Sequence, residues 1–223
     1  RSLIDAVCEG EQPENVTSLL FEDNASAYLT GLIAGRMTET NKVGFIGGME
    51  SPVISKFDYG FRAGVKAANP DAEVMVQYAN SFTDSALGKT IANQMHSKNA
   101  DIIFTCAGAV GIGAIEAAKE NGKKAIGVDQ DQNALAPKNV ITSAMKNIDV
   151  AVVELLSKVV DGSYKGGEVI INTLAMNGVG IPQSSEKNVP PDVLTYVKEE
   201  AEKVKSGEVK VPATKEEFEQ LNK

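Results

Sequence analysis

The sequence has few of the residues on which covalent catalysis depends. Among its 223 residues there are one histidine, two cysteines and no tryptophan. Neither a GxSxG motif nor a GxxxxGK(S/T) motif occurs. The nucleophile elbow of hydrolases and the phosphate-binding loop of nucleoside triphosphatases are therefore both missing. With a single histidine we find no Ser-His-Asp or Cys-His set. The sequence therefore offers no evident nucleophile for covalent catalysis.

Positive charge and long apolar runs are also scarce. The 22 Lys and Arg residues are outnumbered by 30 Asp and Glu residues, which gives a formal net charge of −8. Because proteins bind nucleic acid largely through basic side chains that displace counterions, this balance argues against a nucleic-acid partner. No apolar run approaches the roughly 20 residues of a membrane helix. The chain begins at Arg1, with no signal peptide or lipidation motif.

The cysteines and the histidine lack the neighbours that a metal or redox site requires. Cys8 and Cys106 lie in separate apolar runs, without paired spacing or a flanking histidine. Free cysteines are among the residues most often buried, so we expect two buried thiols and no metal ion. His96 lies near the end of an expected helix, and we expect it on the surface.

From residue 42 onward, apolar runs alternate with helical segments. Several of the runs lack polar alternation, as in strands that are covered on both faces. Expected strands are 43–46, 73–79, 102–107, 125–128, 139–144 and 169–174; expected helices are 52–68 after the cap pair Ser51-Pro52, 84–98, 109–122, 148–160 with Gly162 after its end, and 190–205. Strand, helix and strand in succession predict a parallel α/β sheet.

The two ends of the chain depart from this rhythm. Residues 2–7 and 16–21 have the composition of buried strands, and Asp23 with Asn24 can cap a helix over 25–37. A sheet rarely begins with an interior strand at its second residue, so we expect further sequence upstream. Residues 210–223 are polar, and we expect them to form a mobile tail.

A glycine-rich turn and a later aspartate mark the stretch from 100 to 132. Gly108, Gly111 and Gly113 follow an apolar strand, and Asp129 ends the next one. Both features fall at the carboxyl ends of strands, where open parallel sheets bind ligands. Asp129 follows Gly108 at roughly the 20-residue interval of a dinucleotide-binding fold. The glycine order is GxxGxG rather than GxGxxG, which favours a ribose without a pyrophosphate over NAD.

Two more residues follow strands at the same edge. Phe82 comes after the strand 73–79, where a ring can stack on a base or sugar, although a core position fits its pattern equally well. Lys146 can donate to a sugar hydroxyl, although an isolated lysine is more often a solvated surface charge. Asp131 lies close to Asp129 in sequence, but diverging side chains at a strand end favour a capping role over a metal site.

Several ordered blocks carry a resemblance to a known family. They are KVGFIGGME at 42–50, FxxGFxxG at 57–64, NSFTD at 80–84, DIIF at 101–104 and AIGVDQDQ at 125–132. Together they resemble the basic membrane protein family, the PnrA-like substrate-binding lipoproteins of ABC transporters; Asn80 departs from it, because glycine is usual there. The resemblance implies a type I periplasmic-binding-protein fold, with two doubly wound, parallel α/β lobes that are joined by a three-stranded hinge and close on a nucleoside.

The resemblance implies a ligand-binding role for five residues, with no cofactor, metal or catalytic group. Phe82 would stack on the base, and Gly108 would contact the ligand through its backbone. Asp129 and Lys146 would bind the ribose. Asp5, which follows the first strand, would face the base.

The resemblance also implies a first block of strands and helices, a signal peptide and a lipid-bearing cysteine, none of which is matched here. The first lobe is therefore expected to be incomplete. The expected parts are 1–40, a remnant of the first lobe and a hinge crossing; 41–138, a complete α/β lobe; 139–175, the hinge return and a first-lobe segment; and 176–223, a hinge strand, a helix and the tail.

On this interpretation the protein is an extracytoplasmic, lipid-anchored substrate-binding protein that delivers purine nucleosides to an ABC transporter permease. Pairing of the truncated chain with a second copy stays open. Two other functions also stay open. One is an NAD-dependent oxidoreductase that uses the Gly108 turn and Asp129. The other is the sensor half of a transcription regulator, against which the lack of a basic helix-turn-helix argues.

Overall fold

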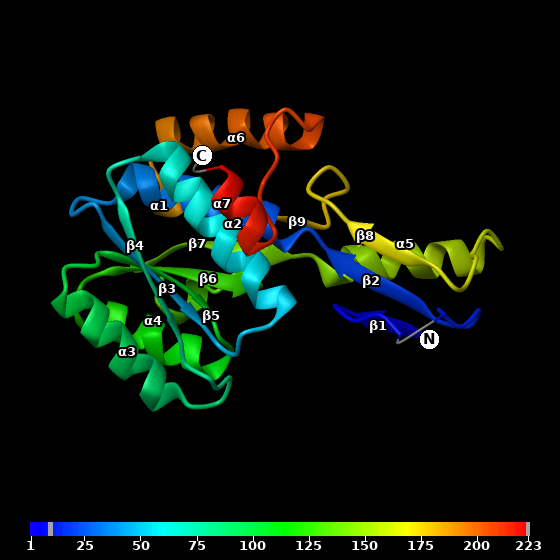
Figure 1. The fold of residues 1–223 in the computed structure, drawn as a ribbon, viewed down its shortest axis with the longest axis horizontal. Coiled ribbons are helices and arrows are strands. Elements are labelled where there is room, and N and C mark those ends of the chain that lie inside the picture. Colours follow the sequence, from blue (N-terminus) through cyan, green and yellow to red (C-terminus); the bar gives the residue numbers. More distant parts are fainter. Residues whose placement is uncertain (9–10, 222–223) are drawn as a thin grey trace.

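A computed structural model describes residues 1–8 and 11–221, which form two sheets (Figure 1). The larger sheet has the order β4-β3-β5-β6-β7-β9 and the smaller the order β1-β2-β8. All strand pairs are parallel except β7 with β9. The strands are β1 (Ser2–Ile4), β2 (Thr17–Phe21), β3 (Lys42–Gly47), β4 (Glu73–Tyr78), β5 (Ile102–Cys106), β6 (Lys124–Asp129), β7 (Val140–Lys146), β8 (Val169–Asn172) and β9 (Val179–Gly180). The predicted parallel α/β architecture is confirmed.

Helices cover both faces of the larger sheet (Figure 1). On one face lie α1 (Asp23–Met37), α2 (Pro52–Ala68), α6 (Pro191–Ser206) and α7 (Lys215–Gln220); on the other lie α3 (Ser85–Ser97) and α4 (Ala109–Glu120). Short 3₁₀ turns occupy Asn133–Leu135 and Gln183–Lys187. The first face packs around fully buried rings, including Phe45, Phe61 and Phe104, whereas the second packs around Ile91, Ile103 and Val110. Within the described residues, no helix has the length and apolar character that crossing a membrane requires.

Helices α1 and α2 approach each other closely because glycines line their contact. A Cβ atom added to Gly64 would lie 2.1 Å from the carbonyl oxygen of Tyr28, and one added to Gly31 would lie 2.2 Å from that of Phe61. Real Cβ atoms are not found at such distances, so any side chain here would push the helices apart. The spaced glycines of the 57–64 block therefore serve helix packing.

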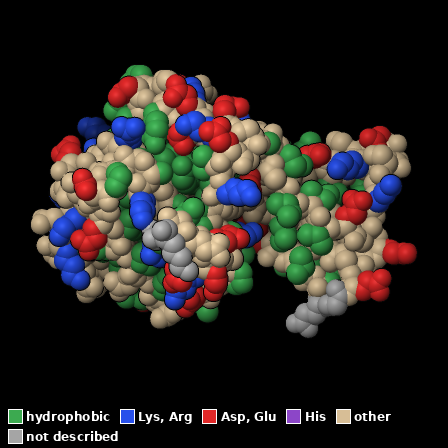
Figure 2. Space-filling view, turned by 45° about the horizontal axis from the view of Figure 1, so that its top comes forward, with side chains coloured by type: hydrophobic (Ala, Val, Ile, Leu, Met, Phe, Trp, Pro, Cys, Tyr) green, Lys and Arg blue, Asp and Glu red, His purple; other side chains and the backbone are tan. Residues whose placement is uncertain are grey.

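The smaller sheet carries helix α5 (Ile148–Val160) and is less completely covered. Ala151 and Leu155 of α5 are buried, but Val153, Leu156 and Val160 on the same helix are exposed, as are Val169 and Ile171 of β8. Figure 2 shows hydrophobic side chains at the surface of this smaller part of the molecule. An apolar helix face and an apolar strand face thus remain open to solvent.

Three expectations from the sequence are wrong. Strand β1 ends at Ile4, so Cys8 lies beyond it and is half-buried, whereas Cys106 is buried as expected. His96 is buried rather than on the surface, with Nδ1 2.9 Å from the carbonyl oxygen of Ala100. The expected tail contains helix α7, whose Phe218 ring lies 5.7 Å from that of Tyr59. The last two residues of that tail lie outside the described residues.

The larger sheet draws on more of the chain than residues 41–138. Strands β3 to β6 lie within that range, whereas β7 and β9 come from beyond it. Helix α1, which precedes the range, packs along α2. The division of the chain into lobe and hinge segments remains a prediction, since a hinge is defined by movement.

Candidate functional site

The carboxyl ends of the two sheets meet at an ion pair. Asp5 directly follows β1 in the smaller sheet, and Lys146 is the last residue of β7 in the larger one. The Nζ atom of Lys146 donates a hydrogen bond to Oδ2 of Asp5. Because ligands of parallel sheets bind where the carboxyl ends converge, this junction is the candidate site.

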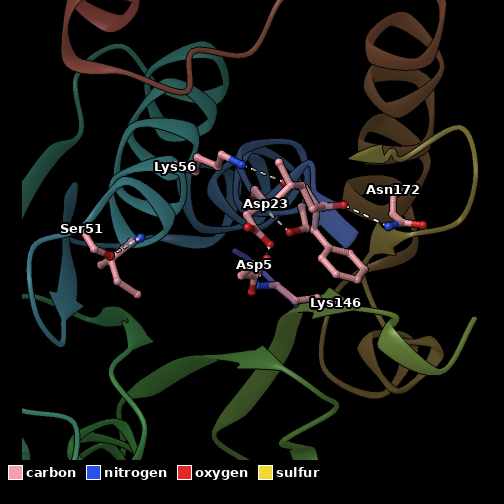
Figure 3. Close-up of polar contacts among 10 residues, drawn as sticks. Asp5, Asp23, Ser51, Lys56, Lys146 and Asn172 are labelled. Atoms are coloured by element: carbon pink, nitrogen blue, oxygen red, sulfur yellow. Dashed lines mark hydrogen bonds and ion pairs between the residues drawn. The ribbon is translucent and has the colours of Figure 1, made fainter. Parts of the chain in front are cut away.

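Lys146 lies at the centre of a compact charged cluster (Figure 3). Its side chain is 5% exposed, and its Nζ atom lies 3.2 Å from Oδ1 of Asp23. The rings of Phe21 and Phe57 each have their centroid 5.5 Å from Nζ. An ammonium group held between two aromatic rings and two carboxylates is fixed in position, and the alternative of a solvated surface lysine is wrong for this residue.

The charges of this cluster shift one another's pKa. Burial disfavours the ammonium form of Lys146, but the carboxylates of Asp23, Asp5 and Asp129 outweigh it and raise the pKa of Lys146. Desolvation raises the pKa of Asp23 to about 7, against the opposing charge of Lys146. Desolvation likewise raises the pKa of Asp129, opposed by Lys146 and reinforced by Asp5. These three carboxylates and one ammonium therefore act as a single electrostatic unit.

Asp129 and Asp131, two residues apart in the same loop, have different surroundings. Asp129 is the last residue of β6 and is exposed at the edge of the cluster. Its backbone has φ 65, a left-handed conformation. Oδ1 of Asp131 instead accepts a hydrogen bond from the backbone N–H of Asn133 at 3.0 Å. This bond reaches the first residue of the 3₁₀ turn Asn133–Leu135, but the N-cap residue of that turn is Gln132, so the capping role predicted for Asp131 stays a prediction.

Phe82 and Gly108 form the other part of the site. The carbonyl oxygen of Phe82 accepts a hydrogen bond from Ala109 N at 2.8 Å, which ties the loop before α3 to the turn before α4. The ring lies against Gly48, where an added Cβ would meet a ring carbon at 2.1 Å. Gly108 has φ 57 and ψ −128, a conformation open essentially to glycine alone. Phe82 is 40% exposed, so the alternative of a core phenylalanine is wrong.

Three of the six non-glycine residues that have positive φ in the described part of the chain lie at these strand ends. Asp5, Asn80 and Asp129 all have positive φ, near 55, 54 and 65 respectively, and they follow or end β1, β4 and β6. Asn and Asp are the non-glycine residues that best tolerate this conformation. Asn80 can therefore stand where the family usually has glycine. Strained backbone of this kind is typical of ligand sites.

Sequence reasoning missed Asp23. It was expected to cap a helix that begins at residue 25, but α1 begins at Asp23 itself, after Glu22, and no side-chain capping bond forms there. The side chain is fully buried and faces Lys146. The signal in the sequence is an acid two residues after the end of the apolar strand β2.

The residues of the candidate site offer several kinds of contact to a ligand. It presents an exposed ring, a bare glycine turn, hydrogen-bond acceptors at Asp5 and Asp129 and a donor at Lys146. In the part of the chain that the structure describes, no three His, Cys, Asp or Glu residues cluster so as to hold a metal ion. The arrangement suits a neutral ligand that combines an aromatic ring with hydroxyl groups.

Comparison with known proteins identifies similar chains. The model of a family described as ABC transporter substrate-binding protein, PnrA-like, matches residues 2–215. Basic membrane protein B of Borreliella burgdorferi is 40% identical over 211 residues, which cover 93% of this chain and 60% of that protein. The ABC transporter nucleoside-binding protein BmpA of Lactococcus lactis subsp. cremoris is 37% identical over 228 residues, 95% of this chain and 64% of that one. The chain thus spans less than two thirds of the length of these relatives.

Solved structures agree with the sequence matches. A solute-binding protein of an ABC transporter system from Aeropyrum pernix K1 superposes with a TM-score of 0.85 at 28% identity, covering 98% of this chain and 72% of that chain. The predicted fold class is confirmed by this likeness.

Proposed function

The chain belongs to the family of PnrA-like substrate-binding proteins of ABC transporters, and from this we propose that it forms part of a protein that binds purine nucleosides for uptake. The family consists of binding proteins rather than enzymes, which removes the NAD-dependent oxidoreductase considered above. The name of the Lactococcus relative, a nucleoside-binding protein, supports a nucleoside as the ligand class. Restriction to purines is our own proposal and comes from the family resemblance, because stacking on the ring of Phe82 would accept any base.

The observation that carries this proposal is that an exposed aromatic ring, a glycine turn and a charged cluster all lie at the carboxyl ends of strands of the larger sheet. Phe82, exposed over the glycine turns, would stack on the base and contribute roughly 1 to 3 kcal/mol. Gly108 would let the ligand approach the backbone, since no side chain lies there. Asp129 and Lys146 would bind the ribose hydroxyls through charge-assisted hydrogen bonds, and Asp5 would accept a hydrogen bond from the base.

Calorimetry with guanosine, adenosine, cytidine, ribose and 2′-deoxyguanosine tests these roles on the intact protein. We expect heat with the purine nucleosides and weaker binding of 2′-deoxyguanosine, because a missing hydroxyl leaves the carboxylate of Asp129 unpaired. Asp129→Asn should weaken guanosine binding roughly tenfold and reduce this discrimination. The matched control is Asp131→Asn, which keeps an acceptor for Asn133 N and should bind like wild type. Equal heats for guanosine and 2′-deoxyguanosine in wild type would refute the role of Asp129.

Family membership also implies an extracytoplasmic location. We propose that a lipid anchor holds the intact protein at the membrane and that an ABC transporter permease receives the nucleoside. A second copy of the chain is a further proposed partner. Its support is the exposed apolar surface of α5 and β8.

A further inference from the structure

Asp23 is a fully buried carboxylate of the site to which the proposed function gives no role. Asp23 is 0% exposed, and among the described residues neither of its carboxylate oxygens has a hydrogen-bond partner. Its nearest compensating charge is the ammonium of Lys146, 3.2 Å away, and the charge of Lys56 adds a smaller contribution. A buried charge without hydrogen bonds is costly, so its presence calls for a physical explanation.

The position of Asp23 relative to Lys146 supplies that explanation. Lys146 is shared between Asp5, which lies toward the smaller sheet and is partly exposed, and Asp23, which is enclosed behind it. Figure 3 shows Asp5 and Asp23 both directed toward Lys146, with Lys56 further off. A ligand can reach Asp5 but cannot reach Asp23. When a ligand engages Asp5, the ammonium of Lys146 therefore loses one partner and keeps the other.

We propose that Asp23 is a positioning residue for ligand binding, which holds the ammonium of Lys146 from behind so that Asp5 can exchange Lys146 for the ligand. This role rests on the proposed function of the site. With Asp23 neutral, Lys146 would depend on Asp5 and Asp129 alone for charge compensation. The ligand would then have to compete with the ammonium of Lys146 for the carboxylates of Asp5 and Asp129, which are the groups that we propose bind it.

Several charged and titratable groups face Asp23 from the surrounding elements. Lys146 comes from β7, Asp5 from the segment after β1, and Lys56 from α2, where its Nζ atom donates to the carbonyl oxygen of Phe21 at 3.1 Å. Burial raises the pKa of the Cys106 thiol at the end of β5, and the charges of Asp129 and Asp23 raise it further. Since the pKa of Asp23 is about 7, this carboxylate changes its charge near neutral pH while Lys146 stays protonated.

The first experiment measures Lys146 without any ligand. Acetylation of Lys146 by acetic anhydride at pH 8 is followed by peptide mass spectrometry in the intact protein, for wild type, Asp23→Asn and Asp58→Asn. A lysine reacts through its neutral amine, so a fall of one unit in its pKa gives a tenfold faster reaction. We expect about a tenfold faster acetylation in Asp23→Asn. Asp58→Asn is the matched control, since Asp58 is also a buried acid but pairs with Arg62 and Tyr78.

The second experiment measures guanosine affinity between pH 5.5 and 8.5 by calorimetry. Wild type should bind more tightly as the pH rises through about 7, where Asp23 ionises. Asp23→Asn should lack this rise and should bind at pH 8 roughly tenfold more weakly than wild type, as wild type does at low pH. Asp58→Asn should keep the wild-type profile. Asp23→Glu, which restores the charge, should recover the rise.

Each result decides a different question. Unchanged acetylation of Lys146 in Asp23→Asn, or an unchanged pH profile of affinity, overturns the positioning role. Guanosine that fails to bind wild type at every pH overturns the proposed function instead, while the acetylation rates still decide whether Asp23 holds Lys146. A variant that is only less stable would bind guanosine more weakly by the same factor at every pH. The pH profile of affinity distinguishes this case from the loss of a positioning residue.

Discussion

The two sheets of this protein follow the same parallel pattern but differ in how they are covered. In the larger sheet, helices cover both faces, and Phe45 on one face and Ile103 on the other are buried. In the smaller part, Ile171 of β8 is 55% exposed and Val160 of α5 is 88% exposed. Both parts have strands without polar alternation, which is the sequence pattern of sheets covered on two faces.

This difference shows that the apolar sequence of a strand indicates burial, whereas the burial itself depends on whether another surface packs on the strand. The apolar residues of α5 and β8 have the composition of interior segments, yet part of them contacts solvent. Their burial would contribute stability at roughly 25 cal/mol per Å² only if another surface packed on them. The larger sheet should therefore hold most of the stability, and the junction with the smaller sheet should hold the binding chemistry.

The largest expected effect tests where the stability lies. Phe104→Ala should lower the free energy of unfolding by about 3 to 5 kcal/mol, because it leaves a cavity among packed rings. Leu156→Ala on the exposed face of α5 should lower it by no more than about 0.5 kcal/mol, as expected for a surface position. Urea denaturation followed by circular dichroism measures both. Similar losses for the two variants would contradict the comparison.

The next largest effect concerns Asp23 at the junction of the sheets. Its pKa in the folded protein is about 7, above the ordinary value of 3.8. The folded state therefore binds the proton more tightly than the unfolded state, so this contribution to stability is fully present below pH 3.8 and is lost as the pH rises through about 7. Asp23→Asn, which is always neutral, should raise the free energy of unfolding at pH 8 on the order of 4 kcal/mol.

Urea denaturation of wild type and Asp23→Asn at pH 5 and pH 8 checks this sign. The two proteins should be closer in stability at pH 5, where Asp23 is largely protonated. A variant that is less stable than wild type at pH 8 would show that the ion pair with Lys146 outweighs desolvation. A more stable variant that binds guanosine more weakly would show that the charge is kept for binding.

Local features of the fold could be predicted from the sequence because neighbours along the chain determine them. Ser51 caps α2 by accepting from Ile54 N at 3.3 Å, with Pro52 in the first position, as predicted. Gly162 follows the end of α5 with φ 79, also as predicted. Strand and helix alternation likewise depends on local apolar patterns. Element boundaries were therefore mostly correct to within two residues.

Features that depend on distant contacts could not be predicted. Asp23 was interpreted as a cap because its neighbours suit one, whereas its partner Lys146 is more than a hundred residues away in sequence. His96 was expected at the surface, but the carbonyl oxygen of Ala100 holds its ring inside. The tail was expected to be mobile, but the rings of Tyr59 and Phe218 pack together. The strand pattern placed Phe82 and Lys146 at one sheet edge but left a core ring and a solvated lysine open, and the family resemblance then favoured their ligand-binding roles.

A smaller effect should arise within the smaller part itself. The hydroxyl of Tyr164 lies 2.9 Å from Oγ1 of Thr17, which joins the loop after α5 to strand β2. Tyr164→Phe leaves buried Thr17 without this partner and should cost about 1 kcal/mol. Hydrogen exchange should show faster exchange for the amides of β2 and unchanged exchange for those of β5. Slower amide exchange in β2, or the same change in exchange rate in both sheets, would mean that the two parts unfold as one unit.

The smallest effect on stability concerns the exposed face of α5, and it decides whether this face has a partner. Val153 and Val160 lie on the solvent side of the helix, 63% and 88% exposed. The double variant Val153→Lys/Val160→Lys should change the free energy of unfolding by less than about 0.5 kcal/mol, because neither side chain is packed. If two copies of the chain pair through this face, sedimentation equilibrium should show dimers in wild type and monomers in the variant, since burying two lysines is unfavourable. Monomers in both proteins would mean that the apolar face does not recruit a second copy.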